Sequence, residues 1–354
     1  MTTDQDTINA AELLKQRGTE LGFQHVGIAA AVTPPGFHPL LDWIDGGYAA
    51  DMNWIERRRD AYQHPDGVLP GTRSVIVAAL NYHNRDPLPN TARIARYAWS
   101  GQNYHKVLHH RLKQLTQILH TTAPESRSRI VVDTAPLLER DFARLAGIGW
   151  FGKNTMLISR EIGSWFFLGA ILTTAQLTYD NPYSEDYCGT CTRCLDACPT
   201  DAFPEAYVLN SQRCISYHTI ENRSEEIPED LTANFGNWVF GCDICQEVCP
   251  HNQPTRRTRS LPVLDAYAER RDGFDLLEVL GWQEQDRREA FVTSSLKRAK
   301  LAMFKRNALI CAGNLLKTRE DEALRRRVEA IALDTDEDSL VRETAREVIK
   351  RFGV

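Results

Sequence analysis

The strongest constraint on this chain is a dense group of cysteines between positions 188 and 249. Four of them follow the pattern C-x-x-C-x-x-C-x-x-x-C-P, a second run follows C-x-x-C-x-x-x-C-P, and one further cysteine lies between the runs. The first pattern is typical of bacterial ferredoxins, in which thiolates bind [4Fe–4S] clusters. Eight thiolates make two sets of four, so the sequence predicts two clusters. The cysteines are Cys188, Cys191, Cys194, Cys198, Cys214, Cys242, Cys245 and Cys249.

The spacing also predicts how these ligands are divided. In such runs three closely spaced thiolates hold one cluster, and the fourth, just before the proline, reaches another. The predicted sets are Cys188, Cys191, Cys194 and Cys249 for one cluster, and Cys198, Cys214, Cys242 and Cys245 for the other. Structural zinc is the alternative, but zinc sites use separated C-x-x-C pairs and need no three-cysteine run ending in Cys-Pro. We therefore interpret the segment as an electron-transfer wire that needs a terminal acceptor.

Composition places the chain among globular proteins of two or three domains. It has 354 residues, 42% of them apolar and 25% charged, with a formal net charge of −5. The longest apolar run, 164–177, is shorter than the roughly 20 residues of a membrane helix and is interpreted as a buried strand. The polar N-terminus has no secretory signal, so we expect a cytoplasmic protein without a membrane contact, whose thiols stay reduced. Cys311, in the apolar phrase ALICAGNLL, is predicted to be a core residue.

The first 180 residues show a mixed pattern of helices and strands. Helices are expected over 7–20, 40–58 and 104–123, and strands at HVGIAAA, SVIVAALNY, RIVVDT and WFFLGAILTT. The phrase GIGWFGKN, 147–154, matches G-x-G-x-x-G and nearly matches a phosphate-binding loop, except that Asn154 replaces Ser or Thr. Those motifs follow a strand and open a helix, whereas here a helical pattern precedes and an extended one follows. We therefore interpret Gly147 as the end of a helix and the phrase as a loop, not as a nucleotide site.

Asp133 is a candidate reactive group because it ends a predicted strand just before a predicted helix. Strand ends of α/β proteins often carry reactive side chains, but a helix cap is an equally good interpretation of the position. The same caution applies to Tyr97, Tyr104 and His105 in ARYAWSGQNYH, since aromatic residues there can simply belong to the core.

From about 275 onward the chain has an almost entirely helical pattern. The phrase FKRNA at 304–308 is echoed by VRETA at 341–345, 37 positions later, a period that suits HEAT-like helical pairs. Between Asp286 and Glu320 there are nine Lys or Arg and three Asp or Glu. This excess predicts either a phosphate-binding stripe or a solvated helix face. The residues concerned are Lys297, Arg298, Lys300, Lys305 and Arg306, with Arg256, Arg257 and Arg259 in the preceding linker.

Several long phrases together resemble one family, the epoxyqueuosine reductases of tRNA modification. They are VVDTAPLLERDFARLAGIGWFGKNTMLIS, GSWFFLGAILTT and the two cysteine runs joined by RCISYHTIE. The resemblance covers nearly the whole chain, and part of it is shared more loosely with reductive dehalogenases. It implies a cobalamin in the N-terminal domain, reduced through the two clusters, and epoxyqueuosine at the wobble position of a tRNA anticodon as the substrate. A histidine ligand to cobalt is not implied, because no D-x-H-x-x-G motif is present.

The resemblance also implies roles for single residues. Asp133 matches the proposed acid of the family, which protonates the departing epoxide oxygen while a cobalt-centred reductant opens the ring. A carboxyl group in this role must stay protonated near neutral pH, and we expect burial beside an electron-rich cobalt to raise its pKa. The glycine loop 147–152 is expected to shape the corrin pocket. The implied cofactor-binding residues are Arg57, Tyr97, Asp133, Asn154, Ser216 and His218.

The predicted architecture therefore has three parts. They are an α/β (α+β) cobalamin-binding catalytic domain over 1–180, a ferredoxin-like two-cluster domain over 181–260, and an all-α HEAT-like tRNA-binding domain over 261–354. We expect a monomer that binds a tRNA anticodon stem-loop and receives electrons from an external low-potential donor. The alternatives are a reductive dehalogenase-like cobalamin enzyme acting on a small molecule, and a non-catalytic electron-transfer or scaffold protein.

Overall fold

The N-terminal part of the protein is built on a four-stranded antiparallel sheet. The computed structural model describes residues 4–83, 92–223, 227–253 and 263–353. The strand order is β1-β2-β7-β4, and every neighbouring pair is antiparallel. The strands span His25–Ala30 (β1), Ser74–Asn81 (β2), Ser128–Val131 (β4) and Phe166–Thr173 (β7). The predicted strands are therefore present, but the sheet is not of the parallel type that places reactive groups at its carboxyl edge.

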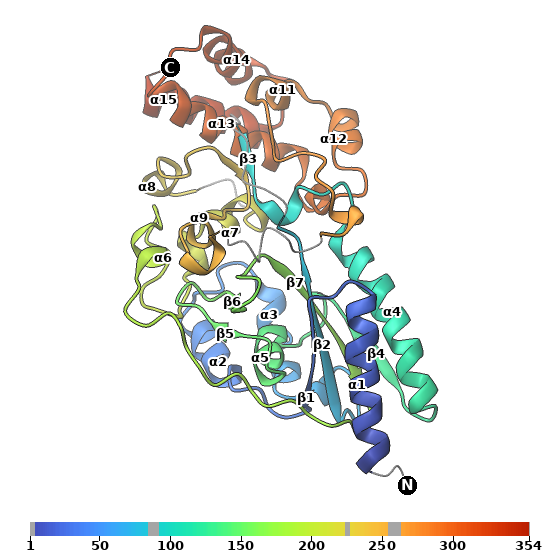
Figure 1. The fold of residues 1–354 in the computed structure, drawn as a ribbon. Helices are drawn as coiled ribbons and strands as arrows, with labels where there is room; N and C mark the ends of the chain where they lie inside the picture. The colour runs from blue at the N-terminus through green and yellow to red at the C-terminus, as the bar shows by residue number, and fades with distance from the viewer. Residues whose placement is uncertain (1–3, 84–91, 224–226, 254–262, 354) are drawn as a thin grey trace.

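Both faces of this sheet are covered by helices. Along β2, Ile76 and Leu80 face a core shared with the long helices α1 (Asp4–Glu20) and α4 (Tyr104–Thr122). Val75 and Val77 face the opposite core, which includes α5 (Glu139–Leu145). Because both faces are buried, β2 reads as a continuous apolar run and not as an alternating pattern. Figure 1 shows α1 and α4 side by side against the sheet and α5 apart from them.

The helix expected over 40–58 is divided into two. It consists of α2 (Phe37–Asp45) and α3 (Asn53–Glu56). The helical pattern is interrupted by Gly46 and Gly47, and Gly47 has a φ of +74°. Residues other than glycine rarely adopt this left-handed backbone, so the glycine pair ends α2 where apolar periodicity alone would continue it.

A second, three-stranded sheet joins segments from all three predicted domains. Its order is β8-β3-β9, with β3 (Ala92–Ile94) parallel to β8 (Trp238–Phe240) and antiparallel to β9 (Gly273–Phe274). Residues around these strands share one hydrophobic core with the helical tail. The predicted boundaries at 180 and 260 therefore do not separate independent cores. A short strand inside the first predicted domain thus completes a sheet with strands of the other two, and the division into three domains stays a prediction.

The cysteine segment consists mostly of loops and short helices. A small hairpin, β5 (Trp150–Phe151) and β6 (Leu157–Ile158), precedes it in the chain. The short helices are α6 (Arg193–Asp196), α7 (Ile215–Ile220), α8 (Glu229–Thr232) and α9 (Ile244–Glu247).

The tail is helical, as predicted. Its helices are α11 (Leu276–Gly281), α12 (Glu284–Ala290), α13 (Leu301–Leu316), α14 (Glu322–Leu333) and α15 (Ser339–Phe352). The two echoed phrases lie on α13 and α15, which pack together, and Phe304 and Val341 are both fully buried. Cys311 is fully buried on α13, which confirms the prediction of a core residue. Among the residues described, no helix is long and apolar enough to cross a membrane.

Candidate iron–sulfur and reductase site

Four of the eight cysteines line one cavity of about 140 Å³. They are Cys188, Cys191 and Cys194 of the first run and Cys249 of the second. We call them the first cysteine set. The cavity brings together thiols that are more than fifty residues apart in the chain, and thiolates are the ligands that iron–sulfur clusters prefer. Trp150 packs against Cys249 and Cys188, and its Nε1 is buried with no hydrogen-bond partner among the described residues. An unpaired N–H at this place can donate to a cluster sulfur, so the site fits the group that the spacing predicts.

The other four cysteines, Cys198, Cys214, Cys242 and Cys245, form the second cysteine set. Burial raises the pKa of the Cys214 and Cys242 thiols, and the neighbouring cysteines of the set act in the same direction. Cys245 likewise interacts electrostatically with Cys214 and Cys198. No three His, Cys, Asp or Glu side chains within the described ranges are placed so that they could hold a single metal ion.

The glycine phrase packs against the cysteine segment. Gly147 has a φ of +75° and follows α5 directly, which confirms that it ends a helix. A Cβ on Gly149 would lie 2.1 Å from the carbonyl oxygen of Ile158, so the close approach of β5 and β6 requires glycine there. Asn154 is 3% exposed, and its Nδ2 donates a hydrogen bond to the carbonyl oxygen of Cys245 at 3.2 Å. These contacts give the loop a structural role beside the cysteines.

Asp133 lies on the loop between β4 and α5, at a φ of +60°. Its Oδ2 accepts a hydrogen bond from the Tyr104 hydroxyl at 2.9 Å and lies 3.4 Å from His105 Nε2. Its backbone N–H donates to Glu139 Oε1 at 2.8 Å, which holds the left-handed turn in place. The interpretation of Asp133 as a helix cap is wrong, because α5 begins at Glu139 and its N-cap residue is Leu138. The Asp133 side chain is 56% exposed, so the carboxylate also faces open space.

The two carboxyl groups of this loop are shifted in opposite directions. The hydrogen bond with His105 lowers the pKa of Asp133 below its ordinary value, and this outweighs the effect of burial. The shift in the protein alone is therefore downward, and the rise expected beside a cobalt centre stays a prediction. Burial raises the pKa of Glu139 to about 8. Neighbouring acids whose environments separate their pKa values are a common feature of proton-transfer sites.

Of two further predicted residues, Tyr97 lies close to Asp133, whereas no contact joins Arg57 to it among the described residues. Tyr97 is half-buried, its ring meets that of Tyr104 edge-on at 6.2 Å, and burial raises its pKa. Arg57 is exposed, and its Nε donates to the carbonyl oxygen of Asn53 at 3.3 Å, one turn back in the same helix. The next residue is the one that reaches the loop, since Arg58 Nη1 donates to the carbonyl oxygen of Thr134 at 3.0 Å. Sequence reasoning missed Arg58 because neighbouring arginines carry no signal that tells them apart.

Ser216 and His218 lie on α7, directly after Cys214. Ser216 is half-buried. His218 is 3% exposed, with Nε2 bonded to the carbonyl oxygen of Gln212 at 2.7 Å and Nδ1 to the Asn222 amide at 2.9 Å. Burial lowers its pKa, so the ring is neutral. Both ring nitrogens are therefore used inside the protein, and the cofactor contact of His218 stays a prediction.

The basic stripe predicted for the tail is only partly exposed. Lys297, Arg298 and Lys300 are exposed. Arg298 forms an ion pair with Glu221 at 2.6 Å, and its guanidinium lies 5.8 Å from the Trp54 ring centroid. It also interacts electrostatically with Asp133. The tail therefore contributes a cation to the surroundings of Asp133, which the sequence pattern alone did not indicate.

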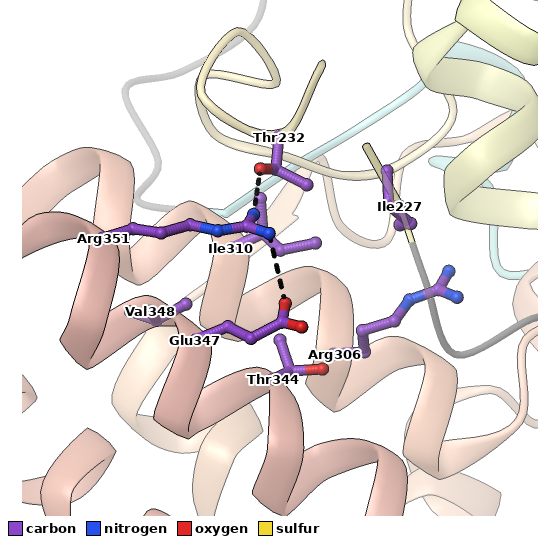
Figure 2. A pocket seen from close by; sticks show the side chains of 8 residues that line it. All are labelled: Ile227, Thr232, Arg306, Ile310, Thr344, Glu347, Val348 and Arg351. Carbon is purple, nitrogen blue, oxygen red and sulfur yellow. Dashed lines mark hydrogen bonds and ion pairs between the residues drawn. The ribbon is translucent and has the colours of Figure 1, made fainter. Parts of the chain in front are cut away.

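Lys305 and Arg306 are buried, so their assignment to a phosphate-binding stripe is wrong. Lys305 is 2% exposed and pairs with Glu337 at 2.7 Å. Arg306 is 1% exposed and donates to the carbonyl oxygens of His218 and Asn222. Figure 2 shows Arg306 beside a small pocket of about 10 Å³, extending away from Arg351. Position in a basic run did not reveal that Arg306 points into the packing between the tail and α7, or that Lys305 is buried with Glu337 inside the tail. Arg256, Arg257 and Arg259 lie outside the described residues.

Comparison with known proteins first gives the class. A family model described as "4Fe-4S double cluster binding domain" matches residues 187–252, so this segment is similar to domains of the two-cluster iron–sulfur class. A second family model, described as "Epoxyqueuosine reductase QueG, DUF1730", matches residues 63–134, which include Asp133.

Relatives then give the particular family. The chain is 46% identical over 272 residues to the epoxyqueuosine reductase of Synechocystis sp., covering 76% of this chain and 92% of the relative. It is 47% identical over 253 residues to that of Gloeobacter violaceus, covering 70% and 77%. This chain belongs to the epoxyqueuosine reductase family.

Solved structures show the same fold. A crystal structure of epoxyqueuosine reductase with an epoxyqueuosine-modified tRNA-Tyr stem-loop matches with a TM-score of 0.85 and 28% identity, covering 97% of this chain and 90% of that one. A Bacillus subtilis epoxyqueuosine reductase, solved with its catalytic aspartate loop swung out of the active site, matches with a TM-score of 0.79 and 26% identity, covering 96% and 89%.

Proposed function

We propose that this chain reduces epoxyqueuosine to queuosine at the wobble position of tRNA anticodons. The observation that carries the proposal is the likeness, over 97% of the chain, to an epoxyqueuosine reductase solved with its modified stem-loop. Converting an epoxide to an alkene consumes two electrons and two protons and releases one water. A site for this reaction needs an electron route and a proton donor. Family membership favours this function over the dehalogenase-like and scaffold alternatives.

The electron route in this proposal runs through the two cysteine sets, each holding one [4Fe–4S] cluster. The family model for a double cluster supports two clusters, and the cavity shared by Cys188 and Cys249 supports the division of the ligands between them. The second set has the closer link to the reaction site, because Arg140 interacts electrostatically with both Asp133 and Cys245. Electrons from an external low-potential donor would therefore enter at the first set and leave from the second.

Cobalamin is the proposed acceptor of these electrons. When bound, it would supply the low-potential electrons that open the epoxide. The surroundings of Asp133 fit a large flat cofactor, because the half-buried aromatic side chains Tyr97 and Tyr104 meet there beside a carboxylate that faces open space. Arg57, Asn154 and Ser216 remain predictions as corrin contacts.

Asp133 is the proposed proton donor to the departing oxygen. The relative from Bacillus subtilis has a catalytic aspartate on a loop that was solved swung out of its active site, and Asp133 lies on a loop in a strained left-handed conformation. With its lowered pKa, Asp133 is ionised at neutral pH and must receive a proton before it can give one. Tyr104 and His105 lie at the same oxygen, Oδ2, and are the groups placed to deliver it. Glu139 holds the loop through the Asp133 N–H.

Substrate binding in this proposal falls to the tail. Its packed helices α13 and α15 suit a HEAT-like repeat, and the exposed cations Lys297 and Lys300 can contact the phosphates of the anticodon stem-loop. We propose that the protein acts as a monomer.

The test is a nucleoside analysis of the product. Anaerobically prepared protein with iron, sulfide and cobalamin restored is incubated with a reductant and a stem-loop that carries epoxyqueuosine, and the digested nucleosides are analysed by mass spectrometry. We expect queuosine with the loaded protein and none with protein lacking clusters. Bound stem-loop that keeps its epoxide in the presence of loaded, reduced protein would contradict the proposed function.

A further inference from the structure

The lysine that makes GIGWFGKN look like a phosphate-binding loop has other partners in this fold. Lys153 is half-buried, and its Nζ donates hydrogen bonds to the carbonyl oxygens of Gly189 at 2.7 Å and Cys191 at 3.0 Å. Both oxygens belong to the loop that carries the first cysteines of the first set. In a phosphate-binding loop the corresponding lysine reaches for phosphate oxygens. Here the ammonium group is occupied by the protein backbone.

The position of Lys153 relative to the cysteines is also defined. Lys153 and Asn154 line the cavity shared by Cys188, Cys191, Cys194 and Cys249. The next residue of the loop, Asn154, bonds the carbonyl oxygen of Cys245 in the second set. The end of the glycine loop thus touches the backbone of both cysteine sets, with the cation directed to the first.

The glycines of the phrase allow this approach. A Cβ on Gly152 would lie 2.6 Å from Asn154 Oδ1 and 2.6 Å from Ile158 Cδ1. A side chain there would push the end of the loop away from the hairpin that supports it. The phrase therefore has a physical reason for its Gly-Lys-Asn sequence that involves no nucleotide.

We propose that Lys153 is a positioning residue for the cluster of the first cysteine set: its ammonium group holds the loop of residues 188–194 closed and makes that cluster easier to reduce. Hydrogen bonds from a charged donor are stronger than neutral ones, so one side chain can fix two carbonyl groups. A cluster gains negative charge when it is reduced, and a nearby cation stabilises the reduced form. Net charge and hydrogen bonding are among the factors that set the potentials of iron–sulfur clusters.

The neighbouring anion does not cancel this effect by pairing with the lysine. Asp186 interacts electrostatically with Lys153, but its Oδ1 accepts from the Cys188 N–H at 2.7 Å and its Oδ2 from the Tyr207 hydroxyl at 2.6 Å. Lys153 and Asp186 therefore contact different backbone atoms of the same loop. The ammonium group of Lys153 donates to carbonyl oxygens, and the carboxylate of Asp186 accepts from an N–H group.

The inference rests on the proposed assignment of the first cysteine set to one cluster, but on neither tRNA nor cobalamin. The experiment is a redox titration of the two clusters by electron paramagnetic resonance, with iron content measured on the same samples. Wild-type protein, purified anaerobically, is compared with Lys153→Met, Lys153→Gln and the charge-conserving Lys153→Arg. Lys113→Met is the matched control, because Lys113 is exposed on α4, away from the cysteine segment in Figure 1.

We expect the midpoint potential of one cluster to become more negative in Lys153→Met and Lys153→Gln, while the other cluster is unchanged. The expected size is a tenfold change in the ratio of oxidised to reduced cluster at a fixed potential, about 59 mV for a one-electron couple. Lys153→Arg should restore most of the wild-type potential, and Lys113→Met should not differ from wild type. If Lys153→Met instead loses half of its iron, retention of that iron by Lys153→Arg equally supports the proposal.

Unchanged potentials in Lys153→Met with full iron content would overturn the inference, as would equal iron loss in Lys153→Met and Lys153→Arg. Failure of the cluster assignment is recognised separately, because Cys188→Ala and Cys249→Ala would then not remove the same iron–sulfur signal.

Discussion

The cysteine segment and the Asp133 site are assembled in opposite ways. Seven of the eight cysteines come from two short runs, so their spacing along the chain already describes most of the ligand geometry. The Asp133 site brings together the start of α4, the loop after β4 and the tail residue Arg298. The spacing of residues along the chain does not predict contacts between segments this far apart. A site whose ligands are close together in the chain can therefore be predicted from the sequence, whereas a site built from distant segments can be described only once the fold is known.

The electrostatics of the two regions differ in the same way. In the second cysteine set burial dominates, and the pKa of Cys214 and of Cys242 rises as expected for desolvated thiols. At Asp133 a hydrogen bond from His105 outweighs burial and lowers the pKa. Desolvation alone therefore does not give the sign of a pKa shift, because a hydrogen-bond partner of the charged form can outweigh it.

The largest expected effect concerns the division of the cysteines. Cys249→Ala and Cys188→Ala should each remove the same cluster, with loss of half the iron and of turnover, because both thiols line one cavity. Cys198→Ala should remove the other cluster, although Cys198 belongs to the same run as Cys188. Electron paramagnetic resonance of the reduced proteins distinguishes the two clusters. Loss of one and the same signal in Cys188→Ala and Cys198→Ala would disprove the crossed arrangement.

The next effect separates buried from exposed cations in the tail. Lys305→Met leaves the carboxylate of Glu337, whose side chain is 15% exposed, without its partner. Breaking a buried ion pair in this way costs roughly 3–5 kcal/mol of the free energy of unfolding. The exposed Lys297 is the matched control, and Lys297→Met should change stability by no more than about 0.5 kcal/mol. Denaturant unfolding measures the free energy of unfolding of both variants. Equal values for Lys305→Met and Lys297→Met would show that Lys305 is not buried with Glu337.

A pH effect is expected from Glu139. Its pKa is about 8 in the folded protein against an ordinary 4.5, so the folded state holds a proton that the unfolded state has lost between these values. This contribution to stability is complete below about pH 4.5 and is lost as the pH rises through about 8. Glu139→Gln cannot ionise, so its stability relative to wild type should increase from pH 5 to pH 8, by at most about 1.4 kcal/mol per pH unit. A difference that stays constant across this window would contradict the shifted pKa.

The smallest effect concerns the exposed part of the basic stripe. Replacing Lys297 and Lys300 by Gln should weaken binding of the stem-loop and reduce the slope of log affinity against log salt by roughly 0.7 to 0.9 for each phosphate that the protein no longer neutralises. Lys317→Gln on the same tail gives the comparison for a change of net charge alone. A salt slope identical to that of wild type would exclude these lysines from the tRNA interface.

The sequence predicted the features of the fold that local patterns mark, and it missed those that depend on contacts between distant segments. Apolar runs located the four main strands, Gly147 marked a helix end, and the buried Cys311 followed from its apolar surroundings. The sheet that links the three predicted domains was not foreseen, because β3 is only three residues long and pairs with strands far along the chain. Arg306 was misplaced because a cation that donates to buried carbonyl groups looks, in sequence, like any surface cation.

The Asp133 site was also predicted only in part, because its long-range contacts leave no pattern in the sequence. Asp133 was found through a long phrase shared with a family, while its contacts with Tyr104 and His105 were indistinguishable from core packing before the fold was known. Glu139 and Arg58 were missed because nothing in a single sequence marks a side chain that bonds a loop backbone.

The most direct measurement is a single turnover with Asp133→Asn. Loaded, fully reduced protein is mixed with one equivalent of stem-loop carrying epoxyqueuosine, and the nucleosides and cluster oxidation states are followed together. The cysteine region should be unaffected, so both clusters should accept electrons as in wild type, while no queuosine forms. Queuosine formed by this variant at the wild-type rate would show that proton delivery does not depend on the Asp133 carboxyl group.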